Sequence, residues 1–116
     1  MAQFVFMYRH DEVEKPSPAQ MEQRMQRWLA WFKRMTDEGR ITDRGVPLER
    51  SGKVVSAAPK RNVTDGPYAE KDLVIGFTLV EADDLAHAIT LSETHPLLLD
   101  GGKIEVRPVY RMLQQA

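Results

Sequence analysis

The sequence predicts an α+β fold in which two helices cover one face of an antiparallel sheet. Three observations predict it. Residues 3–9 and 103–110 alternate in character from one position to the next, which is the period of a β-strand. Along 18–38 the apolar residues recur every three or four positions, which is the period of a helix with one buried face. A chain of 116 residues has the usual length of one domain, which we place at 1–116.

The first strand is predicted at 3–9, where successive side chains point to opposite sides of the sheet. One face would carry Phe4, Phe6 and Tyr8, and the other Val5 and Met7. Because both sets are apolar, both faces of this strand can be covered. The polar residues 10–16, which end in Pro16, form the loop that follows.

The first helix carries clear start and stop signals. Ser17, Pro18 and Gln20 match a capping box with a proline in the first turn. Gly39 supplies the left-handed residue that ends the helix. Trp31 is expected at the edge of the buried stripe. The stripe itself, whose methionines we interpret as core filling, comprises Met21, Met25, Trp28, Leu29, Phe32 and Met35.

The segment 41–63 has a weak pattern and predicts only short strands and turns. A clear strand follows at 73–80. Its Gly76 marks either a bulge or a place where another backbone or a ligand comes close.

A second, shorter helix is predicted to start at an Asp83 cap and to end before Pro96. Its apolar residues include Leu85, Ala88, Ile89 and Leu91. His87 falls on the opposite face, so we expect it in solvent.

The closing strand is predicted at 103–110, where Ile104, Val106 and Pro108 alternate with Glu105, Arg107 and Val109. If the weak middle contributes one principal strand, the order becomes β-α-β-β-α-β, the ferredoxin-like arrangement. One face of that sheet stays bare in a single chain, although it would hold the apolar side chains of Val5, Met7, Val74 and Phe77. We therefore expect a homodimer whose sheets pack face to face.

The composition argues against several classes of partner and cofactor. The 16 basic and 17 acidic residues are interspersed, so neither nucleic acid nor a membrane is expected as a partner. No apolar stretch is long enough to cross a bilayer, and the first residues lack a signal peptide pattern, so we expect a cytoplasmic protein. The absence of cysteine excludes disulfides and thiolate nucleophiles. Three widely spaced histidines match no metal-ligand pattern, and no phosphate-binding loop occurs, so neither a metal nor a cofactor is predicted.

A more specific signal lies at 64–77, which reads TDGPYAEKDLVIGF. The segment joins an Asp-Gly-Pro-aromatic turn to a Glu-Lys pair and then to a strand that contains glycine. Together with His95-Pro96 and with 102–109, it resembles the DGPF subgroup of the YCII-related family. The resemblance implies a ferredoxin-like, dimeric α/β barrel. Some members of that family pair a histidine of the first helix with an aspartate before a proline. This chain has Trp28 and His95 at those positions, so the pair is not implied here.

Three histidines are candidates for acid–base chemistry, because histidine titrates near neutral pH. His95 lies at the end of the second helix, where the helix dipole favours a protonated ring and also gives the residue a structural explanation. His10 stands beside Asp11 and is open to two interpretations, a histidine–carboxylate pair or an exposed loop. His87 is the weakest candidate.

Asp65 has a structural explanation, since an Asp-Gly-Pro turn uses the carboxylate to bond amides ahead of it and uses Gly66 for a positive φ. Such a turn can equally hold a carboxylate at a rigid position beside a pocket. The natural pocket of this fold lies between helix and sheet. Tyr8 and Trp28 would line it for a flat ligand, although tryptophan usually signals packing.

Two functions stay open. The resemblance implies an enzyme of the lyase, isomerase or monooxygenase-like kind that acts on a small organic molecule. In it, His95 or His10 would move a proton and Asp65 would orient the proton carrier or the substrate. Arg107 would hold an anionic group. The alternative is a non-catalytic module, of a regulatory kind linked to transcription, that binds a small ligand or a protein partner.

Overall fold

The computed structural model of the chain describes residues 1–11, 15–68 and 71–110. In chain order its elements are β1 (Ala2–His10), α1 (Pro18–Asp37), β2 (Ile41–Asp43), β3 (Gly52–Ser56), β4 (Asn62–Gly66), β5 (Leu73–Ala82), α2 (Leu85–Ser92), the 3-10 helix η1 (Pro96–Asp100) and β6 (Lys103–Pro108). Ser17 and Gln20 form the predicted capping box at the start of α1.

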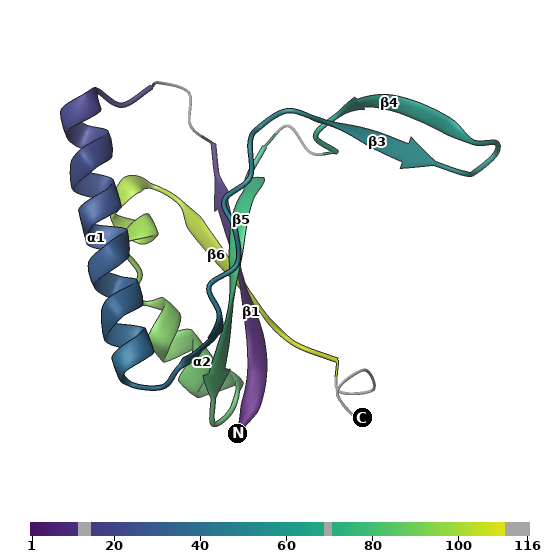
Figure 1. The fold of residues 1–116 in the computed structure, drawn as a ribbon. Coiled ribbons are helices and arrows are strands. Elements are labelled where there is room, and N and C mark those ends of the chain that lie inside the picture. The colour runs from purple at the N-terminus through teal and green to yellow at the C-terminus, as the bar shows by residue number, and fades with distance from the viewer. Residues whose placement is uncertain (12–14, 69–70, 111–116) are drawn as a thin grey trace.

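The main sheet has the strand order β2-β5-β1-β6, and every neighbouring pair is antiparallel. Figure 1 shows α1 and α2 on the same face of this sheet, which we call the inner face. The predicted α+β fold is therefore confirmed, and the order is consistent with the ferredoxin-like arrangement. Within the described residues, no helix is both long and apolar enough to span a membrane.

The core lies between the inner face and the two helices. Phe4, Phe6 and Tyr8 point into it from β1, as their alternation predicted. Opposite them, α1 contributes Trp31 and Met35, and the Trp31 indole donates a hydrogen bond of 2.9 Å to Thr94 Oγ1.

The predicted buried stripe of α1 is wrong at three of its six positions. Met21, Met25 and Leu29 are exposed, whereas Trp31, expected at the edge of the stripe, is only 3% exposed. At Met21 and Met25 the helix stands over an open cleft, so the apolar spacing there reflects the wall of a cleft and not the core. Leu29 lies outside the lining of that cleft.

The second helix also differs from its prediction. Asp84, not Asp83, is the N-cap, and the helix buries Ala88 and Ser92 while Leu85 and Ile89 are exposed. Small residues let the helix approach the sheet closely, which turns the larger apolar residues outward. The side chain of His87 is half-buried, and its Nδ1 accepts the backbone N–H of Asp83 at 3.0 Å.

Strands β3 and β4 form a separate hairpin that projects from the main sheet on the side away from α1 (Figure 1). Asp65 and Gly66 belong to β4 and pair with Lys53 and Gly52, so they do not form the tight turn expected of Asp-Gly-Pro. Gly66 has no positive φ. Ladder pairing along the hairpin holds these residues extended and overrides the local turn preference.

Candidate functional site

A cleft of about 740 Å³ opens between the first half of α1, the segment 44–50 and the inner face of β1 and β5. Its volume falls in the range of sites for small organic molecules. The cleft walls are mostly apolar. They include Tyr8, Met21, Met25, Trp28, Phe32, Val46, Leu48, Ile75 and Leu97.

Two glycines let the segment 44–50 lie against β5. The register of β1 against β5 shifts between Tyr8 and Arg9, so Ile75 is the additional residue of a bulge next to Gly76. A Cβ at Gly76 would lie 2.9 Å from the carbonyl oxygen of Val46, and one at Gly45 would overlap the carbonyl of Phe77. Gly76 therefore marks both a bulge and a close backbone approach, the two outcomes that the sequence predicted.

The floor of the cleft is aromatic. The Tyr8 ring lies 4.9 Å from the Trp28 ring in an edge-to-face arrangement. The Tyr8 hydroxyl is directed away from the cleft, because it donates to Thr78 Oγ1 at 2.7 Å, and Thr78 in turn donates to the carbonyl of Arg44 at 3.0 Å. Burial raises the pKa of Tyr8 well above its usual value. Tyr8 thus offers a ring to a ligand and keeps its proton.

His95 lies behind this floor. Its ring is 4.5 Å from the ring of Trp28 and 4.4 Å from that of Trp31. Nδ1 accepts the backbone N–H of Leu97 at 3.0 Å, so the proton of the neutral ring is on Nε2, which is buried without a partner among the described residues. Burial lowers the pKa of His95 to about 3. The expectation that a helix dipole favours a protonated ring here is wrong, because desolvation outweighs it.

Trp28 and His95 occupy the two positions at which the family resemblance sets a histidine–aspartate pair. Their side chains do meet, in an edge-to-face contact. The positions that hold a histidine–aspartate pair in some members of that family therefore hold an aromatic contact here.

His10 presents a different arrangement at the end of the cleft. Its Nε2 lies 2.7 Å from the backbone carbonyl of Asp100, and a carbonyl can only accept, so Nε2 carries the proton. Nδ1 is left as an acceptor, buried and without a hydrogen-bond partner in the described part of the chain. Arg50 donates to the backbone carbonyl of His10 at 3.1 Å. Both the ring and the backbone of His10 are thereby held in place.

Charged groups gather at the rim of the cleft. The carboxylate of Asp100 lies 3.6 Å from Arg24 and 3.2 Å from Arg27. The guanidinium of Arg44 stacks on the ring of Phe32, 4.7 Å from its centroid. Arg50 completes the rim beside His10.

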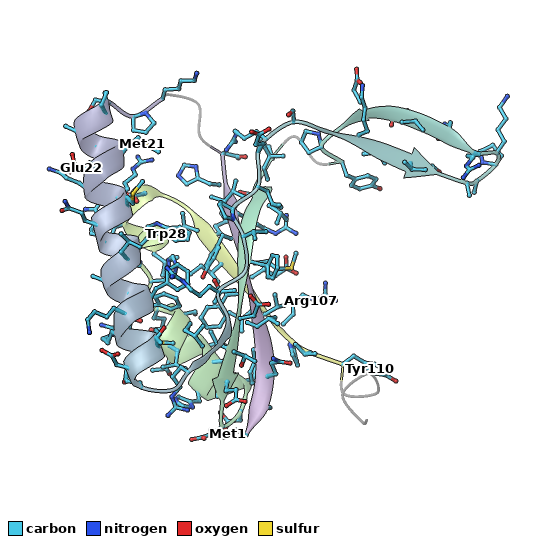
Figure 2. The ribbon with its side chains drawn as sticks, viewed as in Figure 1. Met1, Met21, Glu22, Trp28, Arg107 and Tyr110 are labelled. Carbon is cyan, nitrogen blue, oxygen red and sulfur yellow. The ribbon has the colours of Figure 1, made fainter. Side chains whose placement is uncertain are left out.

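The structure brings together only part of the predicted set. Tyr8, His10 and Trp28 line the cleft, and Figure 2 shows Trp28 directed from α1 towards the sheet. His95 touches that group from behind. Asp65 lies on the projecting hairpin and pairs with Lys53. Arg107 lies on the opposite face of the sheet, as Figure 2 shows.

Sequence reasoning missed Arg44, Arg50 and Asp100. These residues lie in or next to connecting segments, where no periodic pattern indicates which way a side chain points. The one available signal was indirect: Gly76 predicted that another segment approaches β5, without identifying that segment.

Among residues 1–11, 15–68 and 71–110, no group of three or more histidine, aspartate or glutamate side chains has a metal-binding arrangement. The comparisons with known proteins give one result. A family model described as YCII-related domain matches residues 1–113. No curated protein matches the chain significantly.

Proposed function

Because the chain belongs to the YCII-related family, we propose that it uses its helix–sheet cleft to bind a small organic molecule. The exposed apolar wall of this cleft carries the proposal. Met21 and Met25 stand in solvent on the same side of α1 as Trp28, opposite the apolar residues of β5. An apolar hollow of this size with a few polar groups at its rim is the usual form of a ligand site.

The proposed chemistry is proton abstraction by His10, in an isomerase- or lyase-type step. Nδ1 would take a proton from a ligand carbon next to a carbonyl group, and the electron pair of the broken C–H bond would stay on the ligand as an enolate. The resulting imidazolium would still donate from Nε2 to the Asp100 carbonyl. His10 is the favoured base because it lines the cleft and its acceptor nitrogen has no hydrogen-bond partner within the described residues. This nitrogen is buried in the unliganded chain, so the step requires that ligand binding expose it.

A second candidate function is ligand binding without turnover, as in a regulatory module. It is favoured by the surroundings of two other titratable groups near the cleft, which keep them from exchanging protons with a ligand. The Tyr8 hydroxyl is bonded to Thr78, and the neutral ring of His95 is packed among aromatic rings. Binding does not require that any of these groups exchange a proton with the ligand.

A thermal-shift screen of small metabolites tests whether the cleft binds ligands, and one pair of variants locates the site. Met25 and Leu29 lie one turn apart on α1, are 60% and 52% exposed, and only Met25 lines the cleft. We expect Met25→Trp to abolish the rise in melting temperature caused by a ligand and Leu29→Trp to preserve it. Equal ligand shifts in both variants would place binding elsewhere and refute the proposed function.

Deuterium exchange separates the enzyme from the binding module. With a bound ligand that has an acidic C–H, proton abstraction incorporates deuterium from heavy water into the ligand, which NMR detects. We expect exchange with the unmodified protein and none with His10→Gln. Binding without exchange in either protein would favour the non-catalytic module.

We also propose the homodimer in which the outer faces of two sheets pack together. Val5, Met7 and Leu79 point to this face and are only half-buried in one chain. Arg107 is the register partner of Val5 on the same face. Light scattering is expected to give the mass of two chains, and Leu79→Glu is expected to give the mass of one. A single-chain mass for the unmodified protein at micromolar concentration contradicts the dimer.

Two finer assignments accompany this proposal. The Asp65-Gly66-Pro67-Tyr68 segment supports membership of the DGPF subgroup. The absence of cysteine suits the reducing conditions of the cytoplasm.

A further inference from the structure

Among the described residues that line the cleft, guanidinium groups outnumber carboxylates. Arg24, Arg44 and Arg50 stand there with one described carboxylate, that of Asp100. This carboxylate is already shared by Arg24 and by Arg27, which stands just outside the lining. A largely apolar hollow with excess guanidinium groups favours a ligand that brings a negative charge.

Arg50 is the best placed of these groups to bind an anion. One of its terminal nitrogens donates to the carbonyl of His10, and no carboxylate pairs with its guanidinium among the described residues. A guanidinium has five N–H donors in a planar fork, so one bond to a carbonyl leaves donors for a bidentate contact with an oxyanion. Arg44, by contrast, is stacked on Phe32.

His10 lies beside Arg50, and the two are joined by the hydrogen bond from the Arg50 guanidinium to the His10 carbonyl. The Nε2–H of the His10 ring is committed to the Asp100 carbonyl, and Nδ1 is buried. The ring therefore offers the cleft no N–H donor that competes with Arg50 for an anion.

We propose that the ligand of the cleft is an organic anion with a flat apolar body, whose carboxylate or similar group binds Arg50 next to His10. The apolar body lies against Trp28 and Tyr8. This inference rests on the proposed function, since it names the class of ligand for the same cleft.

A matched pair of fluorescent probes tests the charge requirement. Anilinonaphthalenesulfonate and phenylnaphthylamine share an aromatic body and an N–H donor, and only the first carries an anionic group. We expect the sulfonate to bind more tightly than the neutral probe. Arg50→Gln is expected to lower the affinity for the sulfonate about tenfold, which is the loss typical of a charge-assisted hydrogen bond. The affinity for the neutral probe should not change.

Two further variants control this experiment. Arg50→Lys keeps the charge without the planar fork and is expected to give an intermediate affinity for the sulfonate. Arg34→Gln removes one positive charge from α1 at a position outside the cleft lining, and we expect both probes to bind as before. Melting temperatures confirm that each variant is folded.

The outcomes separate this inference from the function on which it rests. If both probes bind equally, and Met25→Trp blocks both while Arg50→Gln affects neither, the cleft is a ligand site but its ligand class is not anionic. If neither probe binds, or Met25→Trp leaves binding of both unchanged, both the proposed function and this inference are contradicted.

Discussion

The Tyr8 hydroxyl donates a hydrogen bond of 2.7 Å to Thr78 Oγ1, which joins residues of β1 and β5 that are 70 positions apart in the chain. The Thr78 hydroxyl in turn donates a hydrogen bond of 3.0 Å to the Arg44 carbonyl. The two bonds connect the core, the floor of the cleft and the segment that forms its outer wall. Each hydroxyl proton has one acceptor, so the orientation of both side chains is fixed.

Replacing Thr78 is expected to lower the free energy of unfolding more than removing the Tyr8 hydroxyl does. Thr78→Val leaves a buried hydroxyl and a carbonyl unpaired and should lower the free energy of unfolding by about 2–4 kcal/mol, against about 1 kcal/mol for Tyr8→Phe. The double variant should lose less than the two single losses combined, because the two residues share one bond. Urea unfolding of the four proteins measures this coupling, and strict additivity would show that the bond contributes nothing.

His95 should make stability depend on pH. Its pKa is lowered to about 3 in the folded chain, below its usual value of 6.5, so the unfolded chain binds a proton first as the pH falls. The contribution is therefore complete above about pH 6.5 and is lost towards about pH 3, by up to about 1.4 kcal/mol for each pH unit. Urea unfolding at pH 7 and at pH 5 measures the loss.

A pair of histidine variants isolates this effect. His95→Asn keeps an acceptor for the Leu97 N–H but cannot titrate, so its stability should fall less than that of the unmodified protein over the same pH interval. His87→Gln, which replaces the half-buried histidine of α2, is the matched control. An unaltered pH dependence in His95→Asn would assign the acid sensitivity to other groups.

The methionines of α1 should differ sharply in their effect on stability. Met35 is fully buried in the core, so Met35→Ala is expected to lower the free energy of unfolding by about 2–5 kcal/mol. Met25 stands over the cleft, and Met25→Ala should cost less than about 1 kcal/mol. Thermal unfolding compares them, and similar losses would mean that the first half of α1 packs in a core after all.

The two tryptophans should report different environments. Trp31 is buried and donates to Thr94, whereas Trp28 borders the open cleft. In Trp31→Phe the remaining fluorescence of Trp28 should be quenched readily by acrylamide and should respond to cleft ligands. In Trp28→Phe the fluorescence of Trp31 should be protected from the quencher. The reverse order of quenching would contradict the assigned orientation of α1.

The parts of the fold with strong periodicity could be predicted from the sequence. The alternation of Phe4, Phe6 and Tyr8 identified both the first strand and its inner face, and Ser17 with Gln20 identified the start of α1. The second helix was predicted at the right place, and of its predicted apolar residues Ala88 is buried and Leu91 packs against the core, whereas Leu85 and Ile89 are exposed. Which residues it buries depends on how closely Ala88 lets it approach the sheet, and local spacing does not contain that distance.

The candidate site was predictable only where a side chain lies on a regular element. Tyr8 and Trp28 were expected to line a pocket between helix and sheet, and they line the cleft. Asp65 was expected at a turn beside a pocket and lies on a projecting hairpin instead. The hairpin pairs with itself, so its position relative to the cleft follows from how it leaves the sheet and not from its own residues.

The sequence by itself determined the order of the elements, the inner face of β1 and the presence of an aromatic helix–sheet interface, because periodicity and capping are properties of neighbouring residues. Tertiary structure alone decided that the first half of α1 stands over a cleft, that His95 is buried and neutral, and that Arg50 and Asp100 meet at His10. Desolvation and hydrogen-bond pairing across distant segments set these features. Neither has a local signature, since each depends on which parts of the chain fold against one another.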